Sequence, residues 1–157
     1  MSSAAMTGGC QCGAVRFRAI SPLGRASLCH CRMCQKAFGG FFGALVSASG
    51  GLVWTRGAPS YFQSSNRVRR GFCGDCGTPL SYEPEGADPE LAIGAFDDPS
   101  AIAPVIQHDV AARMPWFETL AGLPTRTAEE AAQAEAFYAS IVSYQHPDRE
   151  TASTADS

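Results

Sequence analysis

The sequence has no long apolar run and no excess of basic charge. No segment approaches the roughly 20 consecutive apolar residues that cross a membrane as a helix, so we expect no membrane association. Lysine and arginine number 12 against 15 aspartates and glutamates, which gives a net charge of -3. Nucleic-acid-binding domains usually carry a strong basic excess, and we therefore expect no nucleic-acid partner.

Several familiar sequence signals are also missing. The first nine residues lack the basic region and apolar core of a signal peptide, so we expect a cytoplasmic protein. No glycine-rich phosphate loop, Ser/His/Asp arrangement or pair of catalytic carboxylates stands out. What remains is an ordinary globular composition, 45% hydrophobic over 157 residues, which suffices for one domain with a core.

Short segments with strand patterns fill most of the chain. In residues 14–19, Val15 and Phe17 alternate with Arg16 and Arg18, which is the period of a half-buried strand. Further short strands are predicted at residues 41–47, 52–55, 60–63, 68–72, 79–83, 90–96 and 102–108. Glycine, proline and aspartate separate them, and the pattern predicts a mainly β domain.

The C-terminal part of the chain has a helical pattern instead. Thr127 followed by Glu130 matches a capping box, in which each side chain bonds the other residue's backbone N–H. An apolar stripe at helical spacing follows, formed by Ala134, Phe137, Tyr138, Ile141 and Val142. We expect one helix over residues 128–144, with this stripe as its packing face.

Seven cysteines fall into three closely spaced groups. These are Cys10 and Cys12; Cys29, Cys31 and Cys34; and Cys73 and Cys76. In a reducing compartment, clustered cysteines are more often metal ligands or catalysts than disulfides, and an odd number would leave one thiol unpaired. Structural zinc commonly takes four thiolates, whereas catalytic zinc typically keeps one of four positions open. Seven cysteines therefore predict two zinc ions, one with four protein ligands and one with three.

The spacing indicates which cysteines belong together. Residues 73–77 (CGDCG) are typical of a tight turn that presents two sulfurs to one ion, and the glycine-flanked pair at residues 10–12 is its natural partner. The middle three lie within six residues, so one short segment would place them on the second ion. Water or a substrate sulfur would take the fourth position.

Other interpretations of the same residues stay open at this point. The pairs could form disulfides, a redox dithiol or an iron–sulfur cluster. The second zinc site could also be closed by His30 or His108. We interpret His30 as directed outward and His108 as a structural histidine that could enter the site.

Three motifs carry a resemblance to a known family. They are residues 9–13 (GCQCG), 29–34 (CHCRMC) and 72–80 (FCGDCGTPL). With them, the sequence resembles the glutathione-dependent formaldehyde-activating enzyme family, which includes a centromere-protein V branch, over about residues 8–125. The resemblance implies an Mss4-like zinc-containing β fold, with a structural zinc on the first and last cysteine pairs and a second zinc on the middle three. Phe38 departs from the smaller or more polar residue expected in many relatives, which bears on the size of the pocket.

The resemblance also implies an activity. It implies a zinc-dependent carbon–sulfur lyase that forms and cleaves S-hydroxymethylglutathione, with glutathione and formaldehyde as partners and Cys29, Cys31 and Cys34 at the catalytic ion. Because arginine binds carboxylates through a fork of donors, the candidates for binding glutathione are the nearby basic residues Arg32, Lys36, Arg67, Arg69 and Arg70. A non-catalytic thiol-binding zinc protein and a lyase for another thiol adduct are the alternatives.

The expected layout has four parts. A flexible lead at residues 1–7 precedes a zinc domain at 8–125, and a helical segment at 126–145 packs on this domain. A disordered tail at 146–157 follows. The sequence indicates no oligomeric state.

Overall fold

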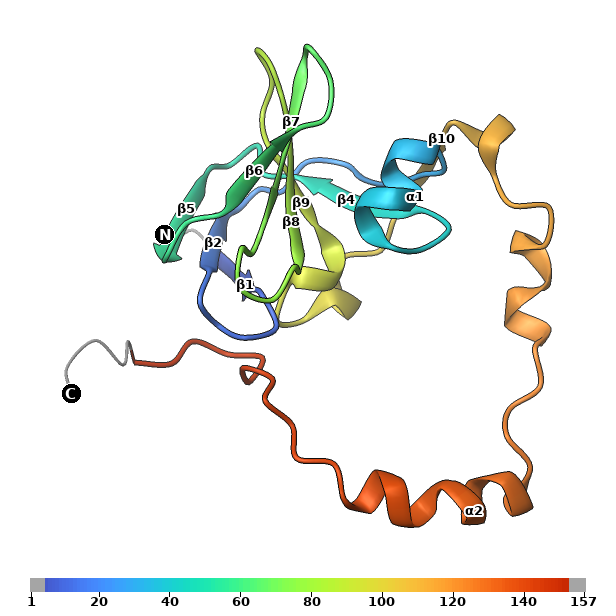
Figure 1. Cartoon of the computed structure of the whole chain (residues 1–157). Helices are drawn as coiled ribbons and strands as arrows, with labels where there is room; N and C mark the ends of the chain where they lie inside the picture. Colours follow the sequence, from blue (N-terminus) through green and yellow to red (C-terminus); the bar gives the residue numbers. More distant parts are fainter. Residues whose placement is uncertain (1–4, 153–157) are drawn as a thin grey trace. The chain divides into compact units, whose positions relative to one another are not determined.

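The computed structural model describes residues 5–152 (Figure 1). They divide into two compact units, one formed by residues 5–113 with 145–152 and the other by residues 114–144. Within the described residues, the first unit holds ten strands in two sheets, which confirms the predicted mainly β class. None of the helices that the structure describes is long and apolar enough to cross a membrane.

The smaller sheet is antiparallel and begins at the N-terminus. Its strands, in spatial order, are β1 (Ala5–Gly9), β2 (Arg16–Ile20) and β5 (Leu52–Arg56). β1 occupies part of the expected flexible lead, because its backbone pairs with β2 along its full length. Residues 1–4 of that lead lie outside the described residues.

The larger sheet has seven strands and forms most of the surroundings of Cys29, Cys31 and Cys34. In spatial order they are β10 (Ile106–His108), β3 (Ala26–Cys29), β4 (Gly43–Ser47), β9 (Glu90–Ala92), β8 (Pro79–Pro84), β7 (Val68–Phe72) and β6 (Ser60–Gln63). β10 pairs with β3 in parallel, and the other neighbours are antiparallel.

The structure corrects several predicted boundaries in this sheet. The predicted strand over residues 90–96 ends at Ala92 and continues as a 3-10 helix over Ile93–Ala95. The strand expected over residues 102–108 begins only at Ile106. Pro104 precedes it and has no N–H to donate to a strand ladder. By contrast, the strands predicted at residues 60–63 and 68–72 are confirmed.

The core lies between the two sheets. Phe17, Leu80 and Leu91 are completely buried and belong to one apolar cluster, although they come from β2, β8 and β9. The ring of Phe17 makes edge-to-face contacts with Phe96, at 5.0 Å between centroids, and with Trp54, at 6.0 Å. Such pairs add to the free energy gained from burying apolar area.

A buried ion pair between Arg16 and Asp97 lies at the edge of this core. Arg16 donates from Nη1 to Oδ1 of Asp97 at 2.8 Å and from Nη2 to Oδ2 at 2.6 Å. The two side chains are 3% and 12% exposed, and Thr7 Oγ1 also donates to Asp97. Glu150, which is 40% exposed, accepts a further bond from Arg16. Burial acts to raise the pKa of Asp97, but the hydrogen bonds from Arg16 and Thr7 hold this pKa below its ordinary value.

Residues 145–152 lie against the turn that carries the first two cysteines. The backbone N–H of His146 donates to the carbonyl of Gln11 at 2.6 Å, and a side chain at Gly13 would collide with the His146 ring. Arg56 donates to the carbonyl of Thr151 at 2.7 Å. This part of the tail, for which we predicted disorder, is therefore hydrogen-bonded to the first unit, and residues 153–157 lie outside the described residues.

The second unit contains α2 (Ala128–Ala139). The predicted capping box is confirmed, since Glu130 N–H donates to Thr127 Oγ1 at 3.2 Å and Thr127 N–H donates to Glu130 Oε2 at 2.8 Å. The helix ends at Ala139 rather than at Tyr144, because Ser140 caps it and bonds the carbonyl of Phe137 with its hydroxyl. The packing of this helix on the domain stays a prediction.

Candidate metal centres

Four cysteine sulfurs converge at the end of β1 and in the turn between β7 and β8. The Sγ atoms of Cys10 and Cys12 are 3.6 Å apart, and those of Cys12 and Cys73 are 3.8 Å apart. With Cys76, all four sulfurs lie within 4.8 Å of one another. Zn–S bonds of about 2.3 Å place the sulfurs of a tetrahedral site about 3.8 Å apart. These four residues, the first cluster, could therefore hold one metal ion.

Two tight turns position the first cluster. Cys10 N–H bonds the carbonyl of Val15 at 3.0 Å, and Val15 N–H points at the Cys10 sulfur at 3.3 Å. The chain turns at Gly13 and Gly77, which have φ of 79° and 78°, a conformation that side chains rarely adopt. Backbone N–H groups directed at ligand sulfurs stabilise the thiolate form.

Three other sulfurs gather where β3 meets a short helix, α1 (Arg32–Phe38). Cys29 ends β3, Cys31 caps the helix, and Cys34 lies in its first turn. The three sulfurs lie within 4.8 Å of one another, and Cys34 N–H donates to Cys31 Sγ at 3.4 Å. We call these three residues the trio. They could hold a second ion that has a position left for another ligand.

α1 was not predicted from the sequence. The cap is a cysteine rather than the usual Ser, Thr, Asp or Asn, and the first turn has no acidic residue. The helix ends at Gly39, whose φ is 62° and whose N–H bonds the carbonyls of Gln35 and Lys36. Gly39 was the residue in the sequence that could have indicated the end of this helix, because a glycine in the left-handed conformation commonly terminates helices.

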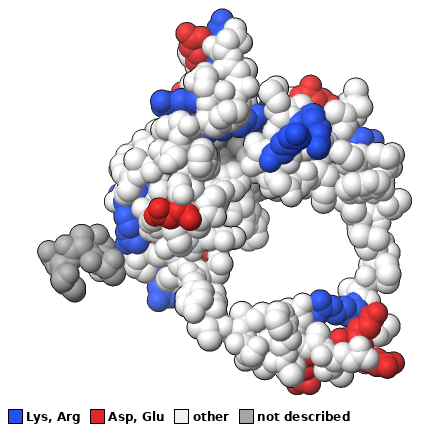
Figure 2. Space-filling view, in the orientation of Figure 1, with Lys and Arg blue, Asp and Glu red and all other residues white. Residues whose placement is uncertain are grey.

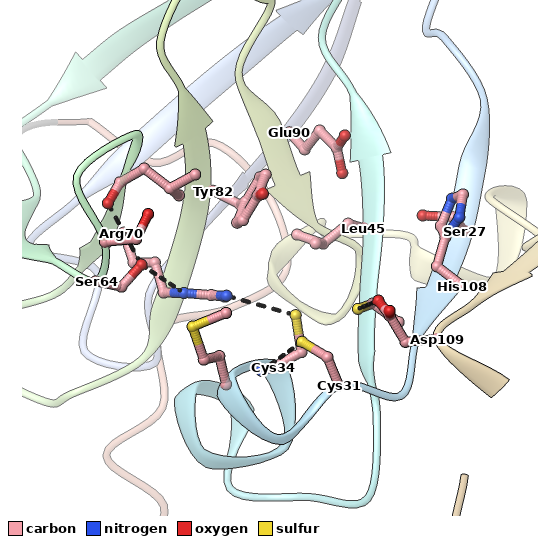
Figure 3. A pocket seen from close by; sticks show the side chains of 14 residues that line it. Ser27, Cys31, Cys34, Leu45, Ser64, Arg70, Tyr82, Glu90, His108 and Asp109 are labelled. Carbon is pink, nitrogen blue, oxygen red and sulfur yellow. Dashed lines mark hydrogen bonds between the residues drawn. The ribbon is translucent and has the colours of Figure 1, made fainter. Parts of the chain in front are cut away.

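A pocket of about 360 Å³ opens over the trio (Figure 3). Strands β3, β4, β7, β8, β9 and β10 contribute to its wall. Its polar side chains include Ser64, Arg70, Tyr82, Glu90, His108 and Asp109. In the first cluster, Cys10 and Cys73 are buried among apolar residues, Cys12 is exposed, and Cys10 also borders a separate pocket of about 310 Å³. All three cysteines of the trio, by contrast, line one and the same pocket.

Arg70 forms one side of this pocket. Only 8% of the residue is exposed, and its Nη2 donates to Cys34 Sγ at 3.5 Å (Figure 3). Its Nε donates to Ser64 Oγ at 3.3 Å, and its guanidinium lies 5.0 Å from the centre of the Tyr82 ring. Burial raises the pKa of the Cys34 thiol, and the hydrogen bond from Arg70 acts in the opposite direction.

His108 and Asp109 form the opposite side. The parallel pairing of β10 with β3 places His108 beside Cys29. Asp109 follows with φ of 54°, in the left-handed region, and its Oδ2 accepts a hydrogen bond from Cys29 Sγ at 3.3 Å. Because this contact joins residues 80 positions apart, no local pattern in the sequence pointed to Asp109.

Glu90 enters the pocket from β9, with its carboxylate directed inward in Figure 3. Burial raises the pKa of this carboxyl, while the charge of His108 acts to lower it. A carboxyl group with a raised pKa is suited to proton transfer near neutral pH. Glu90 was not predicted as a site residue, because nothing around it in the sequence resembles a catalytic motif.

The structure separates the five basic residues that were predicted to bind substrate. Arg70 lines the pocket, and the other four do not: Arg32, Lys36, Arg67 and Arg69. Arg69 points to the other face of β7 and pairs with Glu83 at 2.8 Å, and Arg67 pairs with Glu85 at 3.1 Å on the surface. On the face in Figure 2, basic and acidic side chains are interspersed.

His30 and Phe38 take other positions than expected. The expectation that His30 is directed outward is wrong, because its ring is fully buried and bonds Gln107 Oε1 at 2.8 Å. Phe38 packs against the core, where a side chain at Gly43 would meet its ring at 2.8 Å. Neither residue lines the pocket, so Phe38 does not narrow it.

Comparison with known proteins agrees with this architecture. Residues 5–111 match the sequence model of a family described as glutathione-dependent formaldehyde-activating enzyme. A crystal structure of a Rhodobacter sphaeroides protein is 22% identical, with a TM-score of 0.51, and the match covers 65% of this chain and 99% of that chain. At this identity the likeness shows a shared fold.

Proposed function

Because the chain belongs to the glutathione-dependent formaldehyde-activating enzyme family, we propose that it is a zinc-dependent carbon–sulfur lyase for a thiol–aldehyde adduct. S-hydroxymethylglutathione, formed from glutathione and formaldehyde, is the proposed substrate. The observation that supports this most is the position of the trio at the floor of a pocket.

The donor atoms favour zinc at both clusters. All seven are cysteine sulfurs, and thiolates in tetrahedral arrangement select zinc or iron–sulfur centres. We propose a structural zinc on the first cluster and a catalytic zinc on the trio. When bound at the trio, zinc would lower the pKa of a thiol that coordinates it and act as a Lewis acid toward a departing sulfur.

Cleavage of the adduct needs one proton acceptor. The C–S bond breaks with its electron pair on sulfur, the hydroxyl group of the adduct loses its proton, and its C–O bond becomes the carbonyl of formaldehyde. We assign the proton to Glu90, which points into the pocket and whose pKa is raised by burial. In the reverse direction Glu90 returns this proton to the oxygen as the thiolate attacks the carbonyl carbon.

Arg70 is the basic residue placed to bind an anionic part of the substrate. Its bonds to Ser64 and Cys34 use two of the five N–H donors of a guanidinium. The remaining donors can bind a carboxylate, such as either carboxylate of glutathione. For the four basic residues outside the pocket, the predicted role in substrate binding has no support from their positions.

The test is magnetisation exchange by carbon-13 NMR with labelled formaldehyde, glutathione and zinc-loaded protein. Thiols also add to formaldehyde without a catalyst, so the rate in buffer is the baseline. We expect faster exchange between free and adducted formaldehyde with the wild-type protein than in buffer. Cys31→Ser removes one ligand of the trio and should return the rate to that of buffer. Arg69→Gln, an exposed change on the other face of β7, is the matched control and should keep the wild-type rate.

Two outcomes would decide against the proposal. Exchange at the buffer rate with protein that carries zinc at the trio would exclude this substrate pair and leave a thiol-binding protein or a lyase for another adduct. Acceleration that survives Cys31→Ser would place the activity outside the trio.

A further inference from the structure

Arg70 is a buried cation whose surroundings differ from those of the other arginines described above. Arg16 is also buried, but it forms a bidentate pair with Asp97. Arg67 and Arg69 are exposed and each pairs with a glutamate. Among the residues that the structure describes, no carboxylate forms an ion pair with Arg70, and its contacts are a hydroxyl, an aromatic ring and a cysteine sulfur.

A buried guanidinium without an anionic partner is costly, because the charge loses its hydration without compensation. The group nearest to supplying negative charge is Cys34, to which Arg70 already donates a hydrogen bond. Cysteines bind metal as thiolates, so three thiolates and one divalent cation leave one net negative charge at the trio. One guanidinium neutralises that charge. A thiolate substrate in the fourth position would add another negative charge and make the cation more important.

We propose that Arg70 is a positioning residue of the trio: its guanidinium holds the Cys34 sulfur in place as a metal ligand and neutralises the metal–thiolate centre. This inference rests on the proposed metal at the trio but not on the substrate or the reaction. It gives Arg70 a role in the absence of substrate, which a residue that only binds glutathione would not have. Groups outside the coordination sphere that bond ligand atoms typically change metal affinity by about 10- to 100-fold when removed.

Metal affinity of the purified full-length protein tests the inference. Zinc is withdrawn with a chelator of known affinity. The zinc release that the wild-type protein shows and Cys31→Ser lacks is assigned to the trio. We expect Arg70→Gln to weaken zinc binding at the trio by about 10- to 100-fold and to leave the first cluster unchanged. Arg70→Lys keeps the charge but not the planar arrangement of donors, so its zinc affinity at the trio should lie between those of the wild type and Arg70→Gln. Arg69→Gln, the adjacent residue with its side chain on the other face of β7, is the matched control.

A spectrum distinguishes this role from a general loss of stability. Cobalt replaces zinc, and the sulfur-to-cobalt charge-transfer band reports the electron density on the ligand sulfurs. Loss of the hydrogen bond to Cys34 should shift this band in Arg70→Gln but not in Arg69→Gln. Equal affinities and equal spectra for the two variants would overturn the inference, and so would equal weakening at both clusters. A wild-type protein with no metal at the trio would instead overturn the proposed zinc site, and the inference with it.

Discussion

Replacing Asp97 by asparagine tests the energetics of the ion pair that joins Arg16 of β2 to the segment after β9. The substitution keeps the size of the side chain but removes the charge that faces Arg16. Asparagine cannot accept both guanidinium bonds, since one of its two terminal atoms is a donor. The guanidinium, whose side chain is 3% exposed, would then remain buried with only Glu150 to compensate it.

The expected cost is large for a single substitution. Removing one partner of a buried ion pair typically destabilises a protein by about 3–5 kcal/mol. Asp97 keeps 12% exposure and Glu150 remains as a second partner, so we expect the lower end, about 3 kcal/mol. In a protein of this length, that lowers the melting temperature by about 6–12 °C.

The destabilisation caused by Asp97→Asn should become smaller as the pH falls. The pKa of Asp97 is lowered in the folded protein, whereas an unfolded aspartate has a pKa of about 3.9. Its contribution to stability is therefore complete above the unfolded pKa and is lost as the pH falls through the folded pKa. The difference between wild type and Asp97→Asn should be constant from pH 8 to about pH 5 and shrink below about pH 4.

The assay is urea unfolding of both proteins at each pH with the same metal content. Acid also removes metal from thiolates, but this affects both proteins, and only their difference is compared. Glu150→Gln, which removes the exposed partner of the same guanidinium, is the control and should cost less than about 1 kcal/mol. Equal costs for the two variants, or a difference that does not change with pH, would refute the assignment of the stabilisation to Asp97.

Three further predictions concern the two clusters, the tail and Glu90. Cys73→Ser should leave the protein largely unfolded by circular dichroism, whereas Cys31→Ser should keep the folded spectrum; equal spectra would contradict a structural role for the first cluster. Truncation after Tyr144 removes the segment that covers Gly13, so chelator should withdraw zinc from the first cluster faster than from the full-length protein, as measured by release kinetics. Glu90→Gln should raise stability in urea at pH values above the ordinary glutamate pKa of about 4.3, because a carboxyl whose pKa is raised in the folded protein costs folding free energy when it ionises. The same substitution should slow the carbon-13 exchange, and unchanged exchange would exclude Glu90 as the proton acceptor.

Local patterns in the sequence predicted much of the fold. Short segments separated by glycine, proline and aspartate predicted the strands that form β6 and β7, and the capping box predicted the start of α2. Cysteine counting predicted the two groups of sulfurs that the structure brings together. Alternation in β7 also contained a signal that we did not use, since it places Arg70 on the same face as Val68 and Phe72 and Arg69 on the other.

What local patterns could not predict depends on long-range pairing. His108 and Asp109 reach the trio only because β10 pairs in parallel with β3, and such a register has no signature within either strand. β1 looked like a flexible lead because its partner β2 and the Asp97 carboxylate that binds Thr7 supply the contacts that order it. The pocket wall likewise comes from six strands whose order in the sheet is not their order in the chain.

The two clusters differ in how far apart their ligands lie along the chain. Cys29, Cys31 and Cys34 are close neighbours, whereas Cys12 and Cys73 are 61 positions apart. Short loops cost less conformational entropy to close, so an unfolded or newly made chain can already bind metal through the trio. A ligand that binds folded and unfolded chains alike shifts the folding equilibrium less than one that binds only the folded chain. A newly synthesised chain would therefore acquire the ion proposed for the trio first, although the ion proposed for the first cluster would stabilise the folded state more.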